Sequence, residues 1–284
     1  MSMTINTNTG AINATRLLDN TSRDQMTSME RLTSGLRINR AADDAAGLAV
    51  VTGMTTQIRG LDQAVRNSND AIGLVQTADG AANEITDMLQ RMRELGLQSM
   101  TGTFSADNRT QMDKEYQQLT EEIDRIASTT KFNNNSLMDG TNATFTIQVG
   151  WETASGNQLE IQMTNLGTSA IGRLSGSALA LSIGSTGITT VASASAAIGA
   201  IDGALETINT FRSDLGAAQN RLTYTVSNLS NVSENLQGAR SVIQDANFAQ
   251  ESANLARTQV LQQAGMSMLA QANQQSLNVL SLLR

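Results

Sequence analysis

Apolar residues recur every three or four positions over two long stretches, residues 57–99 and 197–239, and this repeat constrains the fold more than any other feature. In the first stretch they are Ile58, Leu61, Val65, Ile72, Val75, Ala78, Ala82, Ile85, Leu89 and Met92, and in the second Ile201, Leu205, Ile208, Phe211, Leu215, Ala218, Leu222, Leu229, Val232 and Leu236. Such spacing lines one face of an α-helix, as in coiled coils. The chain has no proline, which helix interiors reject. The sequence therefore predicts a mainly α-helical fold, a long antiparallel coiled-coil bundle.

Three further stretches, 12–40, 107–128 and 242–284, have helical periodicity. The seam of the last begins with Val242, Ala246, Ala249, Ala253, Ala256 and Val260. Because no break signal separates it from the preceding stretch, we expect one continuous helix from 197 to about 275. An amphipathic helix is stabilised mainly by packing, so we expect the N- and C-terminal helices to pair into a rod. Their stripes bury little area, so we expect both termini to become ordered on assembly.

The period changes to two in the middle of the chain. Polar and apolar residues alternate in 144–149 and 159–163, which predicts a β-hairpin over about 143–163. A stretch rich in Gly, Ser, Thr and Ala follows, and we expect a short loop or insertion over 164–192. The predicted domains are a terminal-helix domain (1–45 and 244–284) and a helical bundle with the hairpin (46–165 and 193–243).

Composition excludes several classes of function. The chain has no His and no Cys, which removes Cys/His zinc sites, thiol nucleophiles and Ser-His-Asp triads. The acidic pair Asp43-Asp44 precedes small residues and is expected to cap a helix and shape a turn, not to hold a metal. A net charge of −7 argues against nucleic-acid binding, and no apolar run approaches the length of a membrane span. We expect no enzyme activity, no cofactor and no membrane insertion.

Several motifs resemble bacterial flagellin. They are Ile5-Asn6-Thr7-Asn8, the run from Glu30 to Asn39, Asp43-Asp44-Ala45-Ala46-Gly47-Leu48-Ala49, the run from Leu89 to Leu95, the run from Glu122 to Ala127, and Asn278-Val279-Leu280-Ser281-Leu282-Leu283-Arg284. The resemblance covers roughly residues 1–165 and 195–284. Two departures are visible. The variable outer region is reduced to 164–196, and the proline that commonly follows the family's Ala-Asn-Gln motif is absent after Gln274.

The resemblance implies a subunit of the extracellular flagellar filament, exported unfolded through the type III apparatus without a cleaved signal. It also implies a self-polymer whose terminal helices form the inner layer, with a cap protein, hook-associated junction proteins and an export chaperone at the C-terminus as partners. The residues expected to carry polymerisation lie on the terminal stripes: Leu32, Leu36, Ala253, Ala256, Val260, Met268, Leu280 and Leu283.

The resemblance further implies recognition by Toll-like receptor 5 on an exposed face of the bundle. The matching positions are Arg91 and Leu95, four residues apart, and Glu115 on the next helix. The alternative is a solvated charged face formed by Arg91 and Glu115, with Leu95 flanking the apolar seam.

Other functions compete with the filament subunit. A hook–filament junction protein would share the terminal helices. A secreted helical adhesin or effector would remain monomeric with ordered termini. The His-Glu-x-x-His protease motif that some flagellins carry is excluded, because the chain has no histidine.

Overall fold

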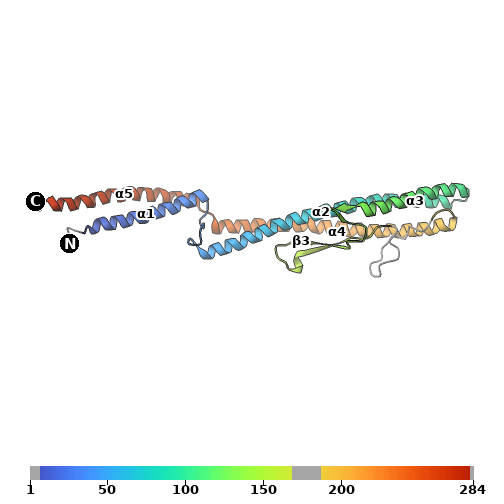
Figure 1. The fold of residues 1–284 in the computed structure, drawn as a ribbon, viewed down its shortest axis with the longest axis horizontal. Helices are drawn as coiled ribbons and strands as arrows, with labels where there is room; N and C mark the ends of the chain where they lie inside the picture. The colour runs from blue at the N-terminus through green and yellow to red at the C-terminus, as the bar shows by residue number, and fades with distance from the viewer. Residues whose placement is uncertain (1–6, 168–186, 282–284) are drawn as a thin grey trace. The chain divides into compact units, whose positions relative to one another are not determined.

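The computed structural model describes residues 7–167 and 187–281, which are mainly helical (Figure 1). The helices are α1 (Thr9–Ser34), α2 (Ala45–Met100), α3 (Ala106–Thr129), α4 (Val191–Gln244) and α5 (Phe248–Ser281). The short strands are β1 (Lys131–Phe132), β2 (Asn135–Ser136), β3 (Thr144–Gln148) and β4 (Gln158–Gln162), with a 3-10 turn, η1 (Ser155–Asn157). The chain divides into two compact units, Met1–Ile58 with Glu234–Arg284 and Arg59–Ser233. The predicted fold class, long helices with a small hairpin, is confirmed.

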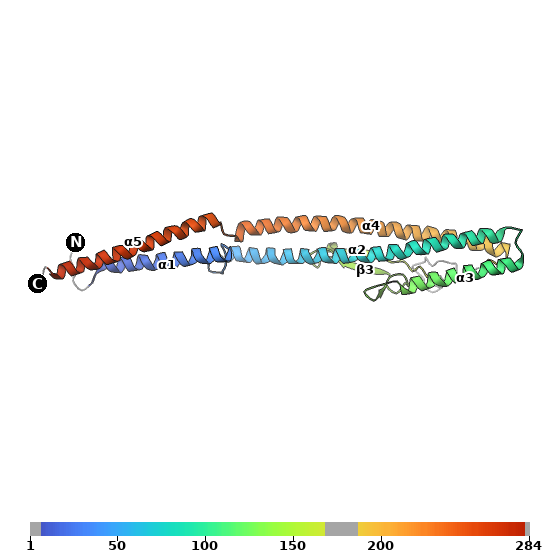
Figure 2. The same ribbon diagram turned by 90° about the horizontal axis from the view of Figure 1, so that it is seen from above.

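The second unit is a bundle in which α2, α3 and α4 run alongside one another (Figures 1 and 2). Its buried apolar residues are Val75, Ala78, Ala82, Ile85, Leu89 and Met92 of α2, Tyr116, Ile123 and Ala127 of α3, and Ala197, Ile201, Ile208, Phe211, Leu215 and Leu222 of α4. The steps of three and four along α2 and α4 are those of a coiled-coil seam. Long narrow seams explain how a chain with only 3% aromatic residues builds a core.

Helix α4 is, among the described helices, the only one long and apolar enough to meet a length-and-composition criterion for a membrane span. The sequence had indicated no such stretch. Its large apolar residues include Ile201, Ile208 and Phe211, which are buried in the bundle core. Core packing therefore accounts for these large apolar residues of α4.

The chain enters α4 through a segment held by two buried polar side chains. The carboxylate Oδ1 of Asp113 accepts a hydrogen bond from the Ile188 N–H at 2.6 Å, and the Ser99 hydroxyl donates to the Ile188 carbonyl at 2.6 Å. Asp113 is 7% exposed and Ile188 is fully buried. Helix α4 therefore begins at Val191, earlier than the start at residue 197 that the sequence indicated, because its first turns bury Ala194 and Ala197. Residues 168–186 of the predicted insertion lie outside the described residues.

The hairpin forms as predicted. Strands β3 and β4 are antiparallel, with Phe145 opposite Ile161 and Ile147 opposite Leu159. Leu159 and Ile161 are buried in the bundle core, so the single apolar face of the hairpin is covered. Just beyond β3, Trp151 approaches α2 at Gly60, where an added Cβ would lie 2.6 Å from the Trp151 Cβ. Only glycine fits this contact without a shift of one element.

The expectation of one continuous helix from 197 to about 275 is wrong. Helix α4 ends at Gln244 and α5 begins at Phe248. The Asn247 side chain accepts hydrogen bonds from the Ala249 N–H at 3.1 Å and the Gln250 N–H at 3.3 Å, as an N-cap does. Because the break contains neither Gly nor Pro, its only local signal is this asparagine.

Candidate assembly surface of the terminal helices

Helices α1 and α5 form a close antiparallel pair, as both views show (Figures 1 and 2). Near the start of α1 the Asn8 side-chain amide donates to the Ala272 carbonyl at 2.9 Å. Farther along, Leu18 packs against Gly265, where an added Cβ would lie 2.8 Å from Leu18 Cδ2. The two backbones come within 8 Å at many positions, which no other pair of described helices does. Glycine and other small residues in the seam permit this approach.

A largely buried ion pair crosses the same seam. Arg31 Nη1 lies 3.1 Å from Glu251 Oε1, and the two side chains are 29% and 9% exposed. The other polar atoms, Arg31 Nε and Glu251 Oε2, are buried without a hydrogen-bond partner. Such a pair adds little net stability but penalises every pairing that separates the charges. The pair holds Arg31 opposite Glu251 and so favours the observed register of α1 and α5.

The inner seam combines leucines with small and polar side chains. The residues of reduced exposure along α1 include Ala11, Ala14, Leu18, Gln25, Ser28 and Leu32, and those along α5 include Glu251, Leu255, Thr258, Gln262, Gly265 and Leu269. Both sets follow steps of three and four. Hydrophobic periodicity identified Leu32, but it missed the small and polar members of the seam, such as the buried Ser28 and Thr258.

Large apolar side chains lie instead on the outside of the pair. We call this set the outer face: Ile12, Leu17, Met26 and Met29 of α1, and Val260, Leu261, Met266 and Met268 of α5, exposed by between 47% and 65%. Large apolar side chains that stay exposed along a helix pair are available for contact with other chains. The pair therefore leaves much of its apolar surface uncovered in the single chain.

The residues predicted to carry polymerisation divide accordingly. Leu32 and Leu36 are half-buried, while Ala253 and Ala256 are exposed. Val260 and Met268 belong to the outer face, each 65% exposed. The expectation that this α5 stripe packs against the N-terminal helix is wrong, because Glu251, Thr258 and their heptad partners occupy that position. Leu280 lies in α5, but its side chain, like Leu283, lies outside the described residues.

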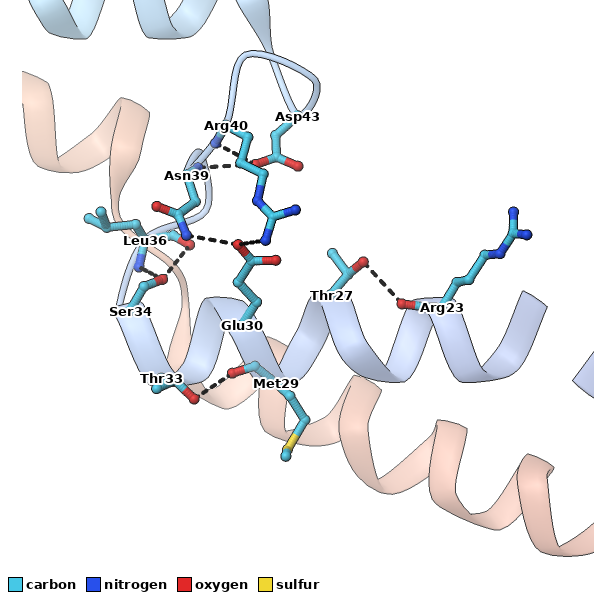
Figure 3. Close-up of polar contacts among 10 residues, drawn as sticks. All are labelled: Arg23, Thr27, Met29, Glu30, Thr33, Ser34, Leu36, Asn39, Arg40 and Asp43. Atoms are coloured by element: carbon cyan, nitrogen blue, oxygen red, sulfur yellow. Dashed lines mark hydrogen bonds and ion pairs between the residues drawn. The ribbon is translucent and has the colours of Figure 1, made fainter. Parts of the chain in front are cut away.

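The end of α1 is a tight polar turn (Figure 3). The helix stops at Gly35, whose φ of 72° is left-handed. Glu30 Oε1 accepts from Asn39 Nδ2 at 2.9 Å and pairs with Arg40 Nη2 at 2.8 Å. Asp43 Oδ2 accepts from the N–H groups of Asn39 at 3.1 Å and Arg40 at 2.9 Å. These two bonds, that of Arg40 first, hold the pKa of the Asp43 carboxyl below its usual value.

Asp44 completes the acidic pair by capping α2, since its Oδ1 accepts from the Gly47 N–H at 2.8 Å. The prediction that Asp43 and Asp44 form a turn and a cap is confirmed. Within the described residues no group of three His, Cys, Asp or Glu side chains could hold a metal ion.

The same turn also meets the end of α4. Gly35 accepts from the Ala246 N–H at 2.9 Å, and the Arg37 N–H donates to the Gln244 carbonyl at 2.7 Å. The Arg37 guanidinium donates to the Ile243 carbonyl at 2.5 Å. The last carbonyls of a helix lack intrahelical donors and carry partial negative charge. Arg37 donates hydrogen bonds to two of these carbonyls. The turn after α1 is therefore hydrogen-bonded to the break between α4 and α5.

The predicted receptor residues lie in the bundle. The Arg91 guanidinium holds Glu115 Oε1 at 3.0 and 2.9 Å and Glu94 Oε2 at 3.1 Å. These hydrogen bonds, that of Glu115 first, raise the pKa of Arg91, and both Arg91 and Glu115 are about half exposed. Leu95 is only 2% exposed and belongs to the core. The expectation that Leu95 shares an exposed face with Arg91 is wrong, because Leu95 continues the buried seam of Leu89 and Met92 in steps of three.

A helical bundle with long coiled-coil seams and an apolar outer face on its terminal helices belongs to the class of assembling structural proteins. Comparison with known sequences identifies the family. The bacterial flagellin N-terminal helical region matches residues 5–143, and the bacterial flagellin C-terminal helical region matches residues 198–283. The chain belongs to the bacterial flagellin family.

Individual relatives agree over the whole length. A flagellin of Halalkalibacterium halodurans is 49% identical over 282 residues, which is 99% of this chain and 100% of the relative. The flagellar filament 33 kDa core protein of Treponema phagedenis is 43% identical over 99% of this chain and 100% of its own. A solved Vibrio parahaemolyticus structure, assigned as a flagellar hook-associated protein, has the same fold at a TM-score of 0.58, with 14% identity over 71% of this chain and 99% of that chain.

Proposed function

We propose that this chain is a structural subunit that polymerises into the extracellular filament of a bacterial flagellum and has no catalytic role. Relatives at 49% and 43% identity over nearly the whole chain are a flagellin and a flagellar filament core protein. The observation that carries the assembly mechanism is the outer face, where α1 and α5 leave eight large apolar side chains exposed.

The outer face supplies the driving force for polymerisation. Full burial of a Val, Leu or Met side chain is worth about 1.5–3 kcal/mol relative to exposure. Val260, Met266 and Met268 are each more than half exposed in the single chain, so other copies of the terminal helices can provide most of this gain. A face that meets a different face of the next copy makes an open helical polymer. Leu280 and Leu283 would extend the face, and ordering of the termini on assembly stays a prediction.

A seeded polymerisation assay tests this role. We compare the full chain with Val260→Glu and with Val191→Glu, which changes an exposed valine of the bundle at the first position of α4. We expect the full chain and Val191→Glu to extend filaments seen by electron microscopy, and Val260→Glu to remain monomeric, because a buried charge without a partner is strongly disfavoured. Equal extension by both variants would contradict the role of the outer face.

The junction-protein alternative is tested by the same assay. The bundle fold does not separate the two, since the hook-associated structure shares it at 14% identity. A junction protein adds to a filament end without propagating. Growth of long filaments from the purified chain alone favours the filament subunit, and so does its high identity to filament proteins.

The remaining partners follow from family membership. We propose that a cap protein and hook-associated junction proteins bind the filament ends, and that an export chaperone covers the apolar C-terminal helix before assembly, with export independent of a cleaved signal. Loss of residues 244–284 should abolish chaperone binding. Chaperone affinity that survives this deletion would place the binding site elsewhere.

Receptor recognition is a separate proposal. We infer that Arg91 and Glu115 can offer Toll-like receptor 5 a polar patch, since both are about half exposed and held together by hydrogen bonds. Leu95 is a core residue of α2 and would act only through the packing of the bundle. Arg91→Ala should weaken activation of a receptor reporter cell at unchanged bundle stability, and Arg93→Ala serves as control because it breaks a similarly exposed pair with Asp202. Equal responses to both variants would leave only the solvated-face interpretation.

A further inference from the structure

The outer face holds four methionines whose thioethers are open to solvent. Met26, Met29, Met266 and Met268 are exposed by 62%, 52%, 56% and 65%. In the bundle, Met92, Met138 and Met163 are at most 6% exposed. Among the described residues outside the terminal pair, Met100 is the most exposed methionine, at 37%. Oxidants in solution would therefore meet the terminal pair first.

The four residues are distributed along the terminal pair. The antiparallel register is set by Leu18 against Gly265 and by Arg31 against Glu251. Met266 directly follows Gly265 and Met268 lies three residues beyond it, so both lie on α5 close to Leu18. Met26 and Met29 lie on α1 between Leu18 and Arg31, and Figure 3 shows the Met29 thioether projecting from that helix.

We propose that Met26, Met29, Met266 and Met268 are a reversible oxidation site through which a peroxide switches off assembly of the free subunit. The inference rests on the proposed function. In the reaction the O–O bond of hydrogen peroxide breaks, and the thioether sulfur gains one oxygen and is oxidised to the sulfoxide. The peroxide is reduced, and its second oxygen leaves as water. Methionine sulfoxide reductases reverse the change with a thiol reductant.

The physical consequence is a more polar outer face, which is the surface that other subunits must cover and exclude from water. Sulfoxide formation turns a flexible apolar side chain into a polar acceptor. Burial of a polar group without a hydrogen-bond partner costs about 1–3 kcal/mol by protein mutational measures, and the apolar gain at that position is lost as well. Four such groups on one helix pair oppose subunit addition, whereas the bundle keeps its core because Met92, Met138 and Met163 are buried.

The test uses the purified full-length chain and filament seeds. We treat monomers with dilute hydrogen peroxide, locate sulfoxides by peptide mass spectrometry and measure filament extension. We expect the four outer-face methionines to be oxidised first, the extension rate to fall at least about tenfold, and treatment with both stereospecific reductases to restore it. Unchanged circular dichroism would show that the bundle is intact.

Two variants identify the responsible sulfurs. For each variant, the filament extension rate with peroxide is divided by the rate of the same variant without peroxide. A difference in basal extension rate between variants therefore does not affect the result. The fourfold Met→Leu variant at residues 26, 29, 266 and 268 should be insensitive to peroxide, since leucine conserves volume and cannot be oxidised. Met100→Leu should remain as sensitive as the unchanged chain.

The outcomes separate the inference from the proposed function. Failure of the untreated full chain to extend any seed would refute the filament role itself. Normal extension by chains that carry the four sulfoxides would overturn the oxidation site, and so would peroxide inhibition that persists in the fourfold variant. A third arm oxidises assembled filaments. Equal oxidation rates in filaments and monomers would show that these methionines stay outside the subunit interface and would overturn the inference.

Discussion

Removal of the Asp113 carboxylate should destabilise the bundle far more than removal of an exposed carboxylate. Asp113 Oδ1 accepts from the Ile188 N–H at 2.6 Å, and its Oδ2 accepts from Gln117 Nε2 at 2.7 Å. Because Ile188 is fully buried, water cannot replace the lost acceptor in Asp113→Ala. A buried donor left without a partner costs about 1–3 kcal/mol, and a hydrogen bond to a charged group contributes a similar amount.

We therefore expect Asp113→Ala to lower the free energy of unfolding by about 2–3 kcal/mol. At about 2–4 °C per kcal/mol for a unit of this size, the melting temperature should fall by about 4–12 °C. Asp113→Asn keeps an oxygen acceptor but no charge and should cost roughly half as much. The matched control is Asp202→Ala, which removes an exposed carboxylate 2.7 Å from Arg93 and should cost under about 1 kcal/mol.

The assay is urea unfolding of the monomer followed by far-UV circular dichroism. The dependence of the unfolding free energy on urea should stay unchanged, which would show that only stability differs. If Asp113→Ala costs no more than Asp202→Ala, then the segment before α4 is not held by this carboxylate, and the reasoning from buried hydrogen bonds fails.

Three further predictions concern other contacts. Glu251→Ala leaves Arg31 partly buried without its partner and should lower the temperature at which filaments dissociate. Replacement of both residues by Met and Leu should restore most of the lost dissociation temperature. A double variant whose filaments dissociate at as low a temperature as those of Glu251→Ala would contradict a role in register alone. Gly60→Leu should destabilise the bundle by about 1–3 kcal/mol through overpacking, because even a Cβ there would lie 2.6 Å from the Trp151 Cβ. The same substitution should shift the fluorescence emission of Trp151. An unchanged emission spectrum would refute the contact between residue 60 and Trp151. Asp43 should titrate below the usual value of about 3.9 by NMR, because the N–H groups of Arg40 and Asn39 favour its charged form. Its contribution to the turn is therefore present above the unfolded pKa and lost as pH falls through the lower folded pKa, and a pKa at or above the usual value would contradict these hydrogen bonds.

The long bundle helices were predictable because one physical pattern dominates them. Where helices bury large aliphatic residues, as at Ile85, Leu89 and Phe211, hydrophobic periodicity and burial coincide. The hairpin was predictable for a related reason, since alternation of period two places Leu159 and Ile161 on one face. The resemblance then identified the family from motifs that the comparisons confirm.

The terminal pair was not predictable in the same way. The residues of its inner seam depend on close backbone approach, as at Gly265, and on charge pairing, as between Arg31 and Glu251. Hydrophobicity pointed to the stripe through Val260 and Met268, which the single chain leaves exposed. The interruption at Asn247 was also missed, because one asparagine is a weak signal inside a long apolar repeat.

Periodicity, composition and motifs are local properties of the chain. The amino-acid sequence alone was therefore enough to predict the helical class, the hairpin, the exclusion of His and Cys chemistry, and the family. Tertiary packing determines which face of each terminal helix is turned inward. It placed Leu95 in the core beside the exposed Arg91, and it turned the apolar stripe of α5 away from α1. The physical reason is that a helix can bury either face, and the choice depends on which neighbour can approach it closely enough.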